Sequence, residues 1–561
     1  MNHFNLFSPP LFHFLSMPVQ EADIFCRYLD LLENSGVGVF FQDEDGIGQG
    51  RPGFDPCALF AMVLFAFADN GGSLRDMERR CMFDCRYNYL ARGTPDHSTL
   101  SVFINDRIKP NAEEIFSLVT KRIFLECGLD CDVVHCDGTK HRALPNKYKF
   151  VWRATAKHAK LTEKAVALCE QIGVPLSVTD GAPVASEALA DAITELSGSM
   201  RGAGIDPGGI FRAKGHRLAP EEKAFLRLSE MLEKCLDYEE VERVCGDRNS
   251  YYKTDADATA MCLKEDYYSG LGSNMHPAYS VQAMVSYGLV ASYYVSQDRS
   301  DFLAFPKALE KHFKMVGSYP RKLSADAGYG NLENYMLMDS LGIEAFVKYT
   351  DWEGESDGSR PPMYHHGEDG RIYCLNNKLC SPEVIEGRHP RKRGYSFYVV
   401  RDCGGCPFMA WCRRFQKEKE GTEKIFEINE LYLTLKESAA KRLLSPEGIE
   451  IRVNRSCQVE GEYGQVKWNM GYDRARRTGL DSVSMEVMLT LLASNVRKFF
   501  RFVRGENPFG YWKAPPGTKA GSFKKPSAKR LSTKARKMGT KKKQPNDLVK
   551  DGYKYKGKRR C

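Results

Sequence analysis

Two short apolar segments of the 561-residue chain each end at an aspartate that is followed within two residues by glycine. The first is the run VVHC, which precedes Asp137, and the second is KLSA, which precedes Asp326. Runs of this composition predict β-strands. Because ligands of open α/β sheets bind at strand ends, we expect an α/β fold whose site contains both aspartates.

The segments between and after these aspartates predict how the sheet is connected. Helical spacing of apolar residues dominates residues 20–128 and returns within a long stretch of about 142–268, after the first strand. The following segments are two strands within 278–296 that turn at Gly288, a helix at 301–314, the strand that ends at Asp326, a helix at 331–341 and a strand at 343–349. This order predicts an α/β sheet with a large helical insertion after its first strand.

Changes in composition predict the domain boundaries. Gly, Pro and Cys interrupt the α/β pattern after residue 350, and helical spacing resumes over 447–467 and 482–502. We therefore expect an N-terminal helical domain at 1–128, an α/β domain at 129–350 and 426–505, a Cys-rich insertion at 351–425 and a disordered basic tail at 515–561.

Composition is that of a globular protein able to bury several cores, with 42% hydrophobic and 27% charged residues. The longest strongly apolar stretch, residues 57–68, is shorter than the roughly 18 residues that a membrane-spanning helix needs, so we expect a buried helix there. No basic leader precedes the first apolar residues, which argues against a secretory signal. Eighteen Cys without such a signal indicate reduced thiols in a cytoplasm.

Positive charge is concentrated at the C-terminal end. Residues 515–561 contain 17 Lys and Arg against two acids, a net charge of +15, whereas the whole chain carries +9. A segment so basic and poor in aliphatic residues is expected to be disordered and to bind a polyanion such as DNA. A solubilising end or a localisation signal remains an alternative. The tail residues that we expect to contact DNA are Lys524, Lys525, Lys529, Arg530, Lys541, Lys542 and Lys543.

A third carboxylate is needed to hold a divalent metal ion with the two aspartates. The segment 455–467 offers Glu460 and Glu462, which point about 200° apart on a helix, so only one can face the sheet. Glu460 shares a face with Lys467, seven residues later, and is preferred because a carboxylate and a lysine together suit a metal and a phosphate. Oxygen ligands favour Mg²⁺ or Mn²⁺ over zinc.

Each of these acids also has an ordinary structural explanation. Asp-Gly is a common turn dipeptide, Asp326 is able to cap a loop, and Glu460 is able to lie on a solvated helix face. Asp96 and His97 resemble catalytic residues, but the string PDHST is better explained as a turn and a helix N-cap.

Five cysteines lie between Asp326 and Glu460, and two of them form the CxxC pair Cys403 and Cys406. Cys374 and Cys412 would complete a zinc site of four thiolates, with Cys380 left over. Scattered free thiols and a redox pair are the alternatives, although no thioredoxin-like pattern surrounds the pair. His365 and His366 are expected in an exposed loop.

Seven blocks of this sequence resemble, in the same order, the bacterial insertion-sequence transposases of the DDE type. The blocks span roughly residues 45–500 and are GRPGFDP (50–56), PDHSTLS (95–101), DGTKHRALPNKYKFVW (137–152), TDADATAM (254–261), HPAYSVQ (276–282), ADAGYG (325–330) and RSCQVEGEYGQVK (455–467). The resemblance implies a ribonuclease H-like mixed sheet with flanking helices, an N-terminal helical domain and a metal-binding triad of Asp137, Asp326 and Glu460. It also supports Cys374, Cys403, Cys406 and Cys412 as a zinc-binding set.

One part of the family signature is altered. The Glu-six-Lys spacing from Glu460 to Lys467 is kept, but Val453 and Ser456 stand where Tyr and Arg occur in related transposases. Arg455 is displaced by one position. This departure leaves open whether excised DNA ends pass through hairpins.

The resemblance implies a transposase that uses Mg²⁺ or Mn²⁺ to cut phosphodiester bonds at the ends of its element. The freed 3′-hydroxyl would attack target DNA, with Lys467 on a phosphate and Lys140 as a further DNA contact. Double-stranded DNA is the expected partner of a homodimer or higher multimer located in the cytoplasm, at the nucleoid. The alternatives are a catalytically silent, zinc-stabilised DNA-binding regulator and a DDE nuclease without strand transfer.

Overall fold

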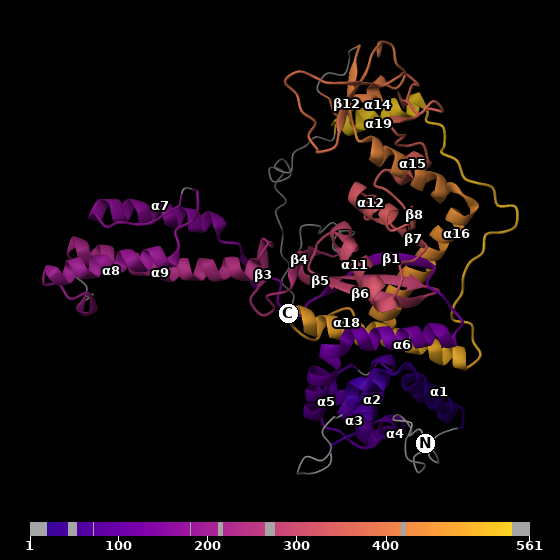
Figure 1. Ribbon diagram of the computed structural model, residues 1–561, viewed down its shortest axis with the longest axis horizontal. Helices are drawn as coiled ribbons and strands as arrows, with labels where there is room; N and C mark the ends of the chain where they lie inside the picture. Colours follow the sequence, from indigo (N-terminus) through magenta and orange to yellow (C-terminus); the bar gives the residue numbers. More distant parts are fainter. Residues whose placement is uncertain are drawn as a thin grey trace, which may run out of the picture.

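The computed structural model describes residues 19–42, 53–70, 72–179, 181–210, 217–263, 275–416 and 422–540. The N-terminal part of this structure is helical (Figure 1). Its helices are α1 (Val19–Ser35), α2 (Pro56–Ala68), α3 (Leu74–Phe83), α4 (Cys85–Ala91), α5 (His97–Phe103) and α6 (Ala112–Glu126). Helix α2 contains the apolar stretch and is buried on nearly all sides, as its composition predicted.

Side-chain caps fix the starts of four of these helices, α2 to α5, and two of the caps are aspartates that the family-like blocks contain. Asp55 accepts a hydrogen bond from the backbone N–H of Cys57 at 2.9 Å at the start of α2. Asp96 accepts one from the N–H of Thr99 at 2.6 Å at the start of α5. The capping role predicted for Asp96 is therefore confirmed.

A mixed sheet forms the centre of the molecule. Its strands are β1 (Val133–Arg142), β4 (Thr259–Cys262), β5 (Met275–Ser286), β6 (Leu289–Ser296), β7 (Lys322–Ala325) and β8 (Glu344–Val347). Strand β1 pairs antiparallel with β5 and parallel with β7, β5 pairs antiparallel with β4 and β6, and β7 pairs parallel with β8. This topology confirms the predicted α/β class and is consistent with the ribonuclease H-like sheet that the resemblance implied.

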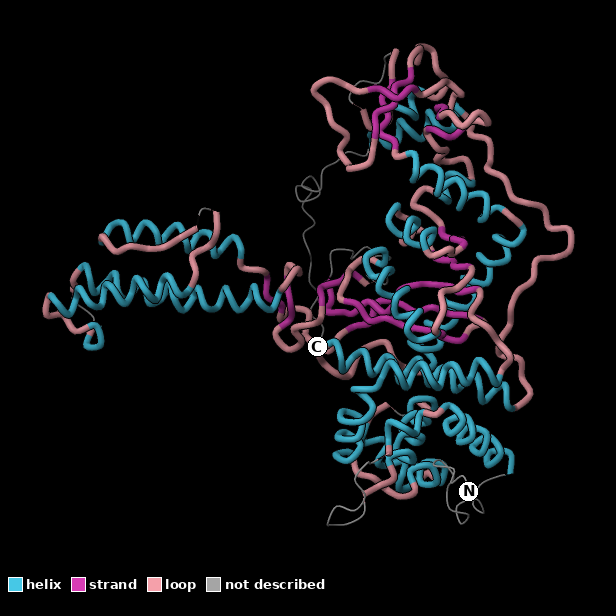
Figure 2. Tube along the Cα trace, in the orientation of Figure 1, coloured by secondary structure: helices cyan, strands magenta, loops and turns pink. Residues whose placement is uncertain are grey.

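Helices cover both faces of the sheet (Figure 2). They are α11 (Asp301–Val316), α12 (Leu332–Ser340), α15 (Glu430–Leu444), α16 (Pro446–Arg455) and α18 (Leu480–Val503). Alternate residues of β5 face opposite layers. Val281, Ala283 and Val285 belong to the core that contains α18, whereas Met284 packs with Phe305 of α11.

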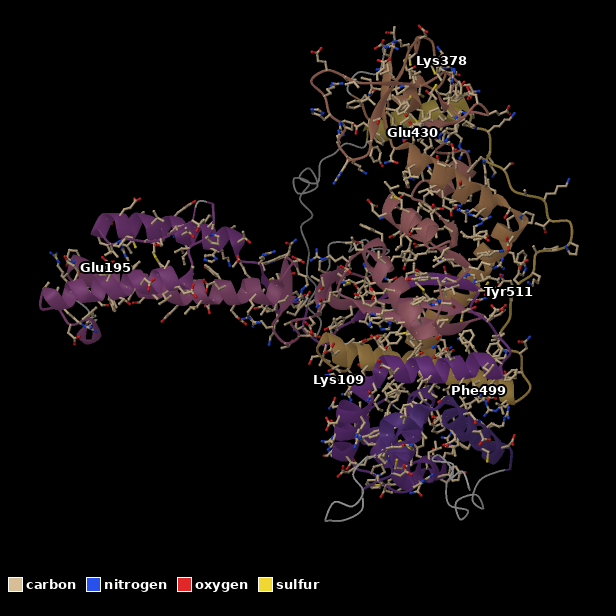
Figure 3. The ribbon with its side chains drawn as sticks, in the orientation of Figure 1. Lys109, Glu195, Lys378, Glu430, Phe499 and Tyr511 are labelled. Carbon is tan, nitrogen blue, oxygen red and sulfur yellow. The ribbon has the colours of Figure 1, made fainter. Side chains whose placement is uncertain are left out.

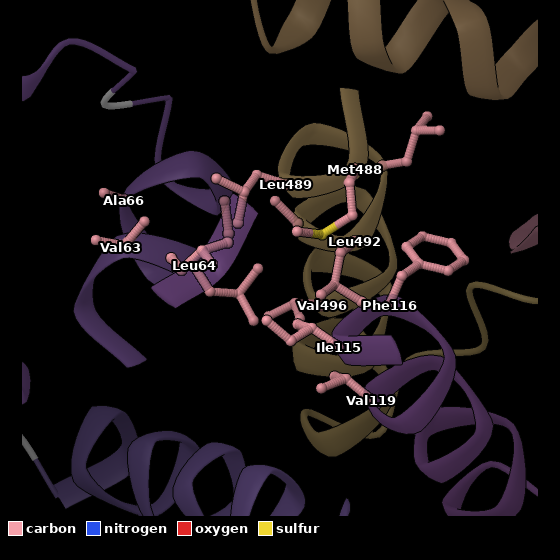
Figure 4. Packing of buried hydrophobic residues seen from close by; sticks show 14 of the residues in the cluster. Val63, Leu64, Ala66, Ile115, Phe116, Val119, Met488, Leu489, Leu492 and Val496 are labelled. Atoms are coloured by element: carbon pink, nitrogen blue, oxygen red, sulfur yellow. The ribbon is translucent and has the colours of Figure 1, made fainter. Parts of the chain in front are cut away.

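Helix α18 joins the sheet to the N-terminal helices. Its residues Met488, Leu489 and Leu492 lie between α2 and α6 in one apolar cluster (Figure 4). Lys109, which precedes α6, donates a hydrogen bond to the Ser482 hydroxyl at 3.0 Å (Figure 3). The fully buried Asn495 side chain binds the edge of β6 twice, because it accepts from Val290 N–H and donates to Val290 C=O, both at 2.9 Å.

A helical arm projects from the sheet between two short strands (Figure 1). Strands β2 (Phe150–Trp152) and β3 (Ser250–Tyr252) pair at its base, and the arm consists of α7 (Thr155–Ile172), α8 (Ser186–Gly202) and α9 (Pro220–Cys245). The arm has its own apolar core, which includes Leu161, Leu189 and Leu228. A separate core allows the arm to keep its shape away from the sheet.

The Cys-rich segment contains small sheets and short helices. These elements are α13 (Trp352–Ser356), β9 (Tyr364–His366), β10 (Ile372–Cys374), β11 (Ser381–Glu383), β12 (Ser396–Val400), α14 (Met409–Cys412) and β13 (Lys424–Ile428). His365 and His366 lie in β9 rather than in a loop, and His366 Nδ1 is 2.8 Å from the Glu437 carboxylate.

The expectation that the tail from residue 515 is disordered is wrong for its described part. Residues 528–540 form α19 (Ala528–Thr540), in which Leu531 and Ala535 are buried against Trp411 of α14. These two apolar residues are four apart and share one helix face, which is sufficient for packing on an existing surface. Lys541, Lys542 and Lys543 lie outside the described residues.

None of the helices in the described ranges is long and apolar enough to cross a membrane.

We predict that Asn495→Ala lowers the free energy of unfolding by about 1–3 kcal/mol, because both backbone groups of Val290 lose their partner in a buried place. Urea titration followed by tryptophan fluorescence measures this change. Arg501→Ala on the same helix removes an exposed ion pair with Glu506 and is the control, with an effect below about 1 kcal/mol. Equal stability of the two variants would contradict the prediction.

Candidate active site

Strand β1 continues through Asp137 to Arg142, so the expectation that the strand ends at Asp137 is wrong. It pairs with β7 only over Val133–His135, whereas its pairing with β5 runs from His135 to Arg142. Asp137 lies just beyond the point where β7 ends, and Asp326 directly follows the last residue of β7. Both aspartates therefore lie at the same edge of the sheet.

The charges at this edge act on one another. Burial and, after it, the charge of Asp326 raise the pKa of the Asp137 carboxyl to about 6, although Arg455 acts in the opposite direction. The Asp137 side chain is 20% exposed, and its Oδ2 lies 3.5 Å from Arg455 Nη1. Two carboxylates that repel each other in this way favour a cation between them.

A third acid at this edge, Asp301, was not predicted from the sequence. It is the first residue of α11, and burial raises the pKa of its carboxyl, with a further contribution in the same direction from Asp326. A Cβ atom at Gly138 would lie 2.5 Å from Asp301 Oδ1. The glycine after Asp137 is therefore required for the close approach of Asp301 to β1. The sequence predicted a helix from residue 301 but carried no signal that its first side chain lies here.

The buried amide of Gln282 holds several of these groups together. Gln282 pairs with Gly138 across β5 and β1, and its Nε2 donates to Asp301 Oδ1 at 2.9 Å. Its Oε1 accepts a hydrogen bond from the Tyr329 hydroxyl. Because Tyr329 belongs to the loop that starts at Asp326, this amide links the loop to β1 and α11.

Hydrogen bonds between side chains and backbone N–H groups, together with a closely packed glycine, fix the loop after β7. Asp326 Oδ1 accepts from Gly328 N–H at 2.8 Å, and Asn331 caps α12 by accepting from Asn334 N–H at 2.9 Å. A Cβ atom at Gly330 would lie 2.2 Å from the carbonyl oxygen of Lys348. The glycines of the string ADAGYG therefore allow a tight loop directly behind Asp326.

Glu460 and Glu462 point in different directions, as their helical spacing predicted. Glu462 is buried and forms an ion pair with Lys498 of α18. Glu460 is exposed, and no hydrogen bond or ion pair within the described residues joins it to Asp137 or Asp326. The structure therefore brings the two aspartates together with Asp301 and leaves the Glu460 side chain in solvent.

The segment that carries Glu460 is nevertheless bonded to β1. It contains α17 (Gly461–Gly464) between two π-helical turns, Ser456–Glu460 and Gln465–Asn469. The Tyr463 hydroxyl donates to the carbonyl oxygen of Asp137 at 2.7 Å. Lys467 Nζ donates to the carbonyl oxygen of Lys140 at 3.0 Å. Lys140 in turn donates to the carbonyl oxygen of Arg299 at 2.7 Å, beside Asp301.

No group of three or more His, Cys, Asp or Glu side chains within the described ranges is arranged to hold a metal ion. The donor types at the sheet edge still suit a hard divalent cation, because carboxylate oxygens are the ligands that Mg²⁺ and Mn²⁺ prefer. A bound cation would also relieve the repulsion between the carboxylates of Asp137 and Asp326.

The four cysteines expected to bind zinc line one small pocket of about 30 Å³. They are Cys374, Cys403, Cys406 and Cys412. Burial raises the pKa of the Cys412 thiol to about 11, and the nearby Lys424 acts in the opposite direction. Cys380 is also buried but does not line the pocket.

The cations expected to contact DNA at the C-terminal end are exposed where the structure describes them. Lys524 and Lys525 precede α19, and Lys529 and Arg530 lie in its first turn. The segment that precedes α19 is bound to the rest of the protein, because the N–H of Lys524 donates to the carbonyl oxygen of Ser356 at 3.2 Å. These side chains therefore extend from a docked segment.

Two family matches support the resemblance. Residues 373–500 match the family described as "Transposase DDE domain", and residues 21–106 match the "Transposase domain (DUF772)". No curated protein and no solved structure matches the chain. The first match covers the cysteines and Glu460, and the second covers most of the N-terminal helices. The chain is therefore a transposase of the DDE type, the family that its sequence resembles.

Proposed function

We propose that this transposase cuts phosphodiester bonds at the ends of an insertion sequence and joins the freed 3′-hydroxyl to target DNA. The observation that supports this proposal is the position of Asp137 and Asp326 at one edge of the sheet, next to the segment that carries Glu460. Asp137, Asp326 and Glu460 would hold Mg²⁺ or Mn²⁺. When bound, such ions stabilise the charge that develops on a phosphodiester during in-line displacement.

The side chains around the triad have positioning roles in this proposal. Arg455 holds the Asp137 carboxylate, and Gln282 fixes Asp301 and, through Tyr329, the loop of Asp326. Lys467 and Lys140 supply positive charge beside β1 for a DNA phosphate. Substrate positioning of this kind contributes much of the rate of phosphoryl-type transfers.

DNA also accounts for the exposed cations outside the site. Lys529 and Arg530 would contact duplex DNA from α19, together with the lysines that follow residue 540. We propose that the enzyme acts as a homodimer or higher multimer on paired DNA ends, and that it is located with the DNA of the nucleoid.

The triad predicts the outcome of isosteric substitutions. Asp137→Asn, Asp326→Asn and Glu460→Gln should each reduce Mg²⁺-dependent cleavage of a duplex carrying the element's end to below about one-hundredth of wild type, because each removes a ligand charge. DNA binding, measured by gel shift, should be retained. Detection of joined products separates a transposase from a nuclease that only cuts.

Two controls accompany the triad variants. Asp473→Asn removes the same charge from an exposed position and should cut normally. Glu462→Gln should also cut, although loss of its ion pair with Lys498 should lower thermal stability. If all three triad variants cut like wild type, the catalytic assignment fails; if the wild type binds DNA and never cuts it, the protein is a DNA-binding regulator.

The raised pKa of Asp137 predicts a stability difference that does not depend on activity. This pKa increases from its ordinary value of 3.8 to about 6 in the folded protein. The folded protein therefore holds the Asp137 proton more tightly than the unfolded chain does. This contribution to stability is fully present below about pH 4 and is lost as the pH rises through 6. In chelator-containing buffer, Asp137→Asn should be more stable than wild type at pH 7.5 by on the order of 3 kcal/mol, and most of this gain should be lost at pH 4.

Urea titration at the two pH values measures this effect. Asp473→Asn should show no such gain at either pH, since its side chain is exposed. A wild type that is as stable as Asp137→Asn at pH 7.5 would show that the fold does not raise the pKa of Asp137.

The cysteine pocket supports a structural zinc ion as a further part of the proposal, bound by Cys374, Cys403, Cys406 and Cys412. We predict about one zinc per chain by elemental analysis of protein purified without chelators. Cys403→Ser or Cys406→Ser should lose the metal and lower the melting temperature, because metal binding contributes folding free energy. Cys380→Ser should retain the zinc. Zinc-free wild-type protein of full stability would refute the site.

A further inference from the structure

The helical arm has an overall negative charge but concentrates its cations in one groove. Residues 155–245 contain eleven Lys and Arg against fifteen Asp and Glu, a net charge of −4. A groove of about 670 Å³ between α7 and α9 is nevertheless lined by five cations and a single carboxylate, Glu230. The five cations are Lys157, Lys160, Lys164, Arg227 and Lys234. Because the arm as a whole is negative, the positive groove indicates a local site for an anion.

The cations form two rows that face each other across the groove. Lys157, Lys160 and Lys164 are three and four residues apart and share one face of α7. Arg227 and Lys234 are seven residues apart and share one face of α9. At a rise of 1.5 Å per residue, each row extends for about 10 Å. A site of this length exceeds one phosphate and corresponds to about three consecutive phosphates of a DNA strand, at 3.4 Å each along the duplex.

The charges of both rows are available to a ligand. All five side chains are exposed, and none of them forms an ion pair or a side-chain hydrogen bond with another described residue. Arg243 differs from them on the same helix, because it forms an ion pair with Glu240 at 2.6 Å. Cations without carboxylate partners keep their full attraction for a polyanion.

The base of the arm continues this surface toward the catalytic sheet. Strand β2 and its approaches carry exposed aromatic side chains, with Tyr148 77% and Trp152 59% exposed. Lys149 and Arg153 alternate with them and are also exposed. Exposed aromatic and basic residues in alternation are typical of surfaces that bind nucleic acid. In sequence this surface begins with Lys147, seven residues after Lys140 of β1, and leads directly into the row of α7.

We propose that the groove between α7 and α9 binds the sugar-phosphate backbone of duplex DNA that extends from the catalytic sheet. The inference rests on the proposed function, because it assigns the arm to DNA outside the site of cleavage. The bound atoms are phosphate oxygens, and the contact is independent of base sequence.

A charge-neutralised variant tests this proposal in the full-length protein. Lys157→Gln, Lys160→Gln and Lys164→Gln are combined, and the probe is a fluorescently labelled 50-base-pair duplex of arbitrary sequence. The plot of log K against log salt should become less steep by about 2 to 3, since each phosphate contact contributes about 0.9. Affinity at 0.1 M salt should decrease at least about tenfold.

The matched control removes three exposed charges from elsewhere on the arm. Arg201→Gln, Arg217→Gln and Lys223→Gln change the net charge equally but do not line the groove. Circular dichroism checks that both proteins are folded. Equal DNA binding by both triple variants and the wild type would overturn the groove assignment and leave the proposed function intact. Loss of self-association in sedimentation, with unchanged DNA binding, would instead identify an acidic surface of a second copy as the ligand. A wild type that does not bind DNA would refute the proposed function and this inference together.

Discussion

The site depends on the unequal lengths of two neighbouring strands. Strand β1 runs seven residues beyond its last pair with β7, and among the named strands of the described sheet only β5 pairs with that extension. Because β7 ends early, its following loop turns at Asp326 beside the extended part of β1, where Asp137 lies. If β7 paired with β1 along its whole length, hydrogen-bonded backbone would occupy the place of this loop. Backbone pairing in the sheet thus brings the two carboxylates to the same edge, and the side-chain contacts of Arg455 and Gln282 then hold the groups around them.

Bringing acids together costs stability, and the surrounding residues limit that cost. Burial and Asp326 raise the pKa of Asp137, and Asp301 contributes in the same direction. Arg455 offsets part of the repulsion, while the Gln282 amide donates to Asp301. None of these contacts removes the repulsion completely. A site in which carboxylates still repel each other is expected to bind a cation readily, because the cation removes a repulsion that the folded protein already contains.

Much of the fold could be predicted from the sequence, because the strands and long helices follow simple apolar periodicities. The turn at Gly288, the helix that starts at Asp301 and the buried helix α2 all agree with that pattern. Asp301 could not be recognised as part of the site, since its role depends on the tertiary position of α11 beside Gly138. Helix α19 was missed for a similar reason. Among its side chains that the structure describes, Leu531 and Ala535 are buried, and they become sufficient for packing only when Trp411 offers a surface.

The altered family signature shows how local geometry is able to compensate for sequence. In a regular α-helix, residue 456 rather than Arg455 would share a face with Glu460, because four residues make slightly more than one turn. The turn Ser456–Glu460 is a π-helix, which holds about one more residue per turn. The extra residue places Arg455 where residue 456 would otherwise lie, and its guanidinium indeed reaches 3.5 Å from Asp137 Oδ2. Although Arg455 is displaced by one position in the sequence, its charge still lies at the sheet edge. The altered signature therefore changes the spacing of the motif and keeps the position of its positive charge.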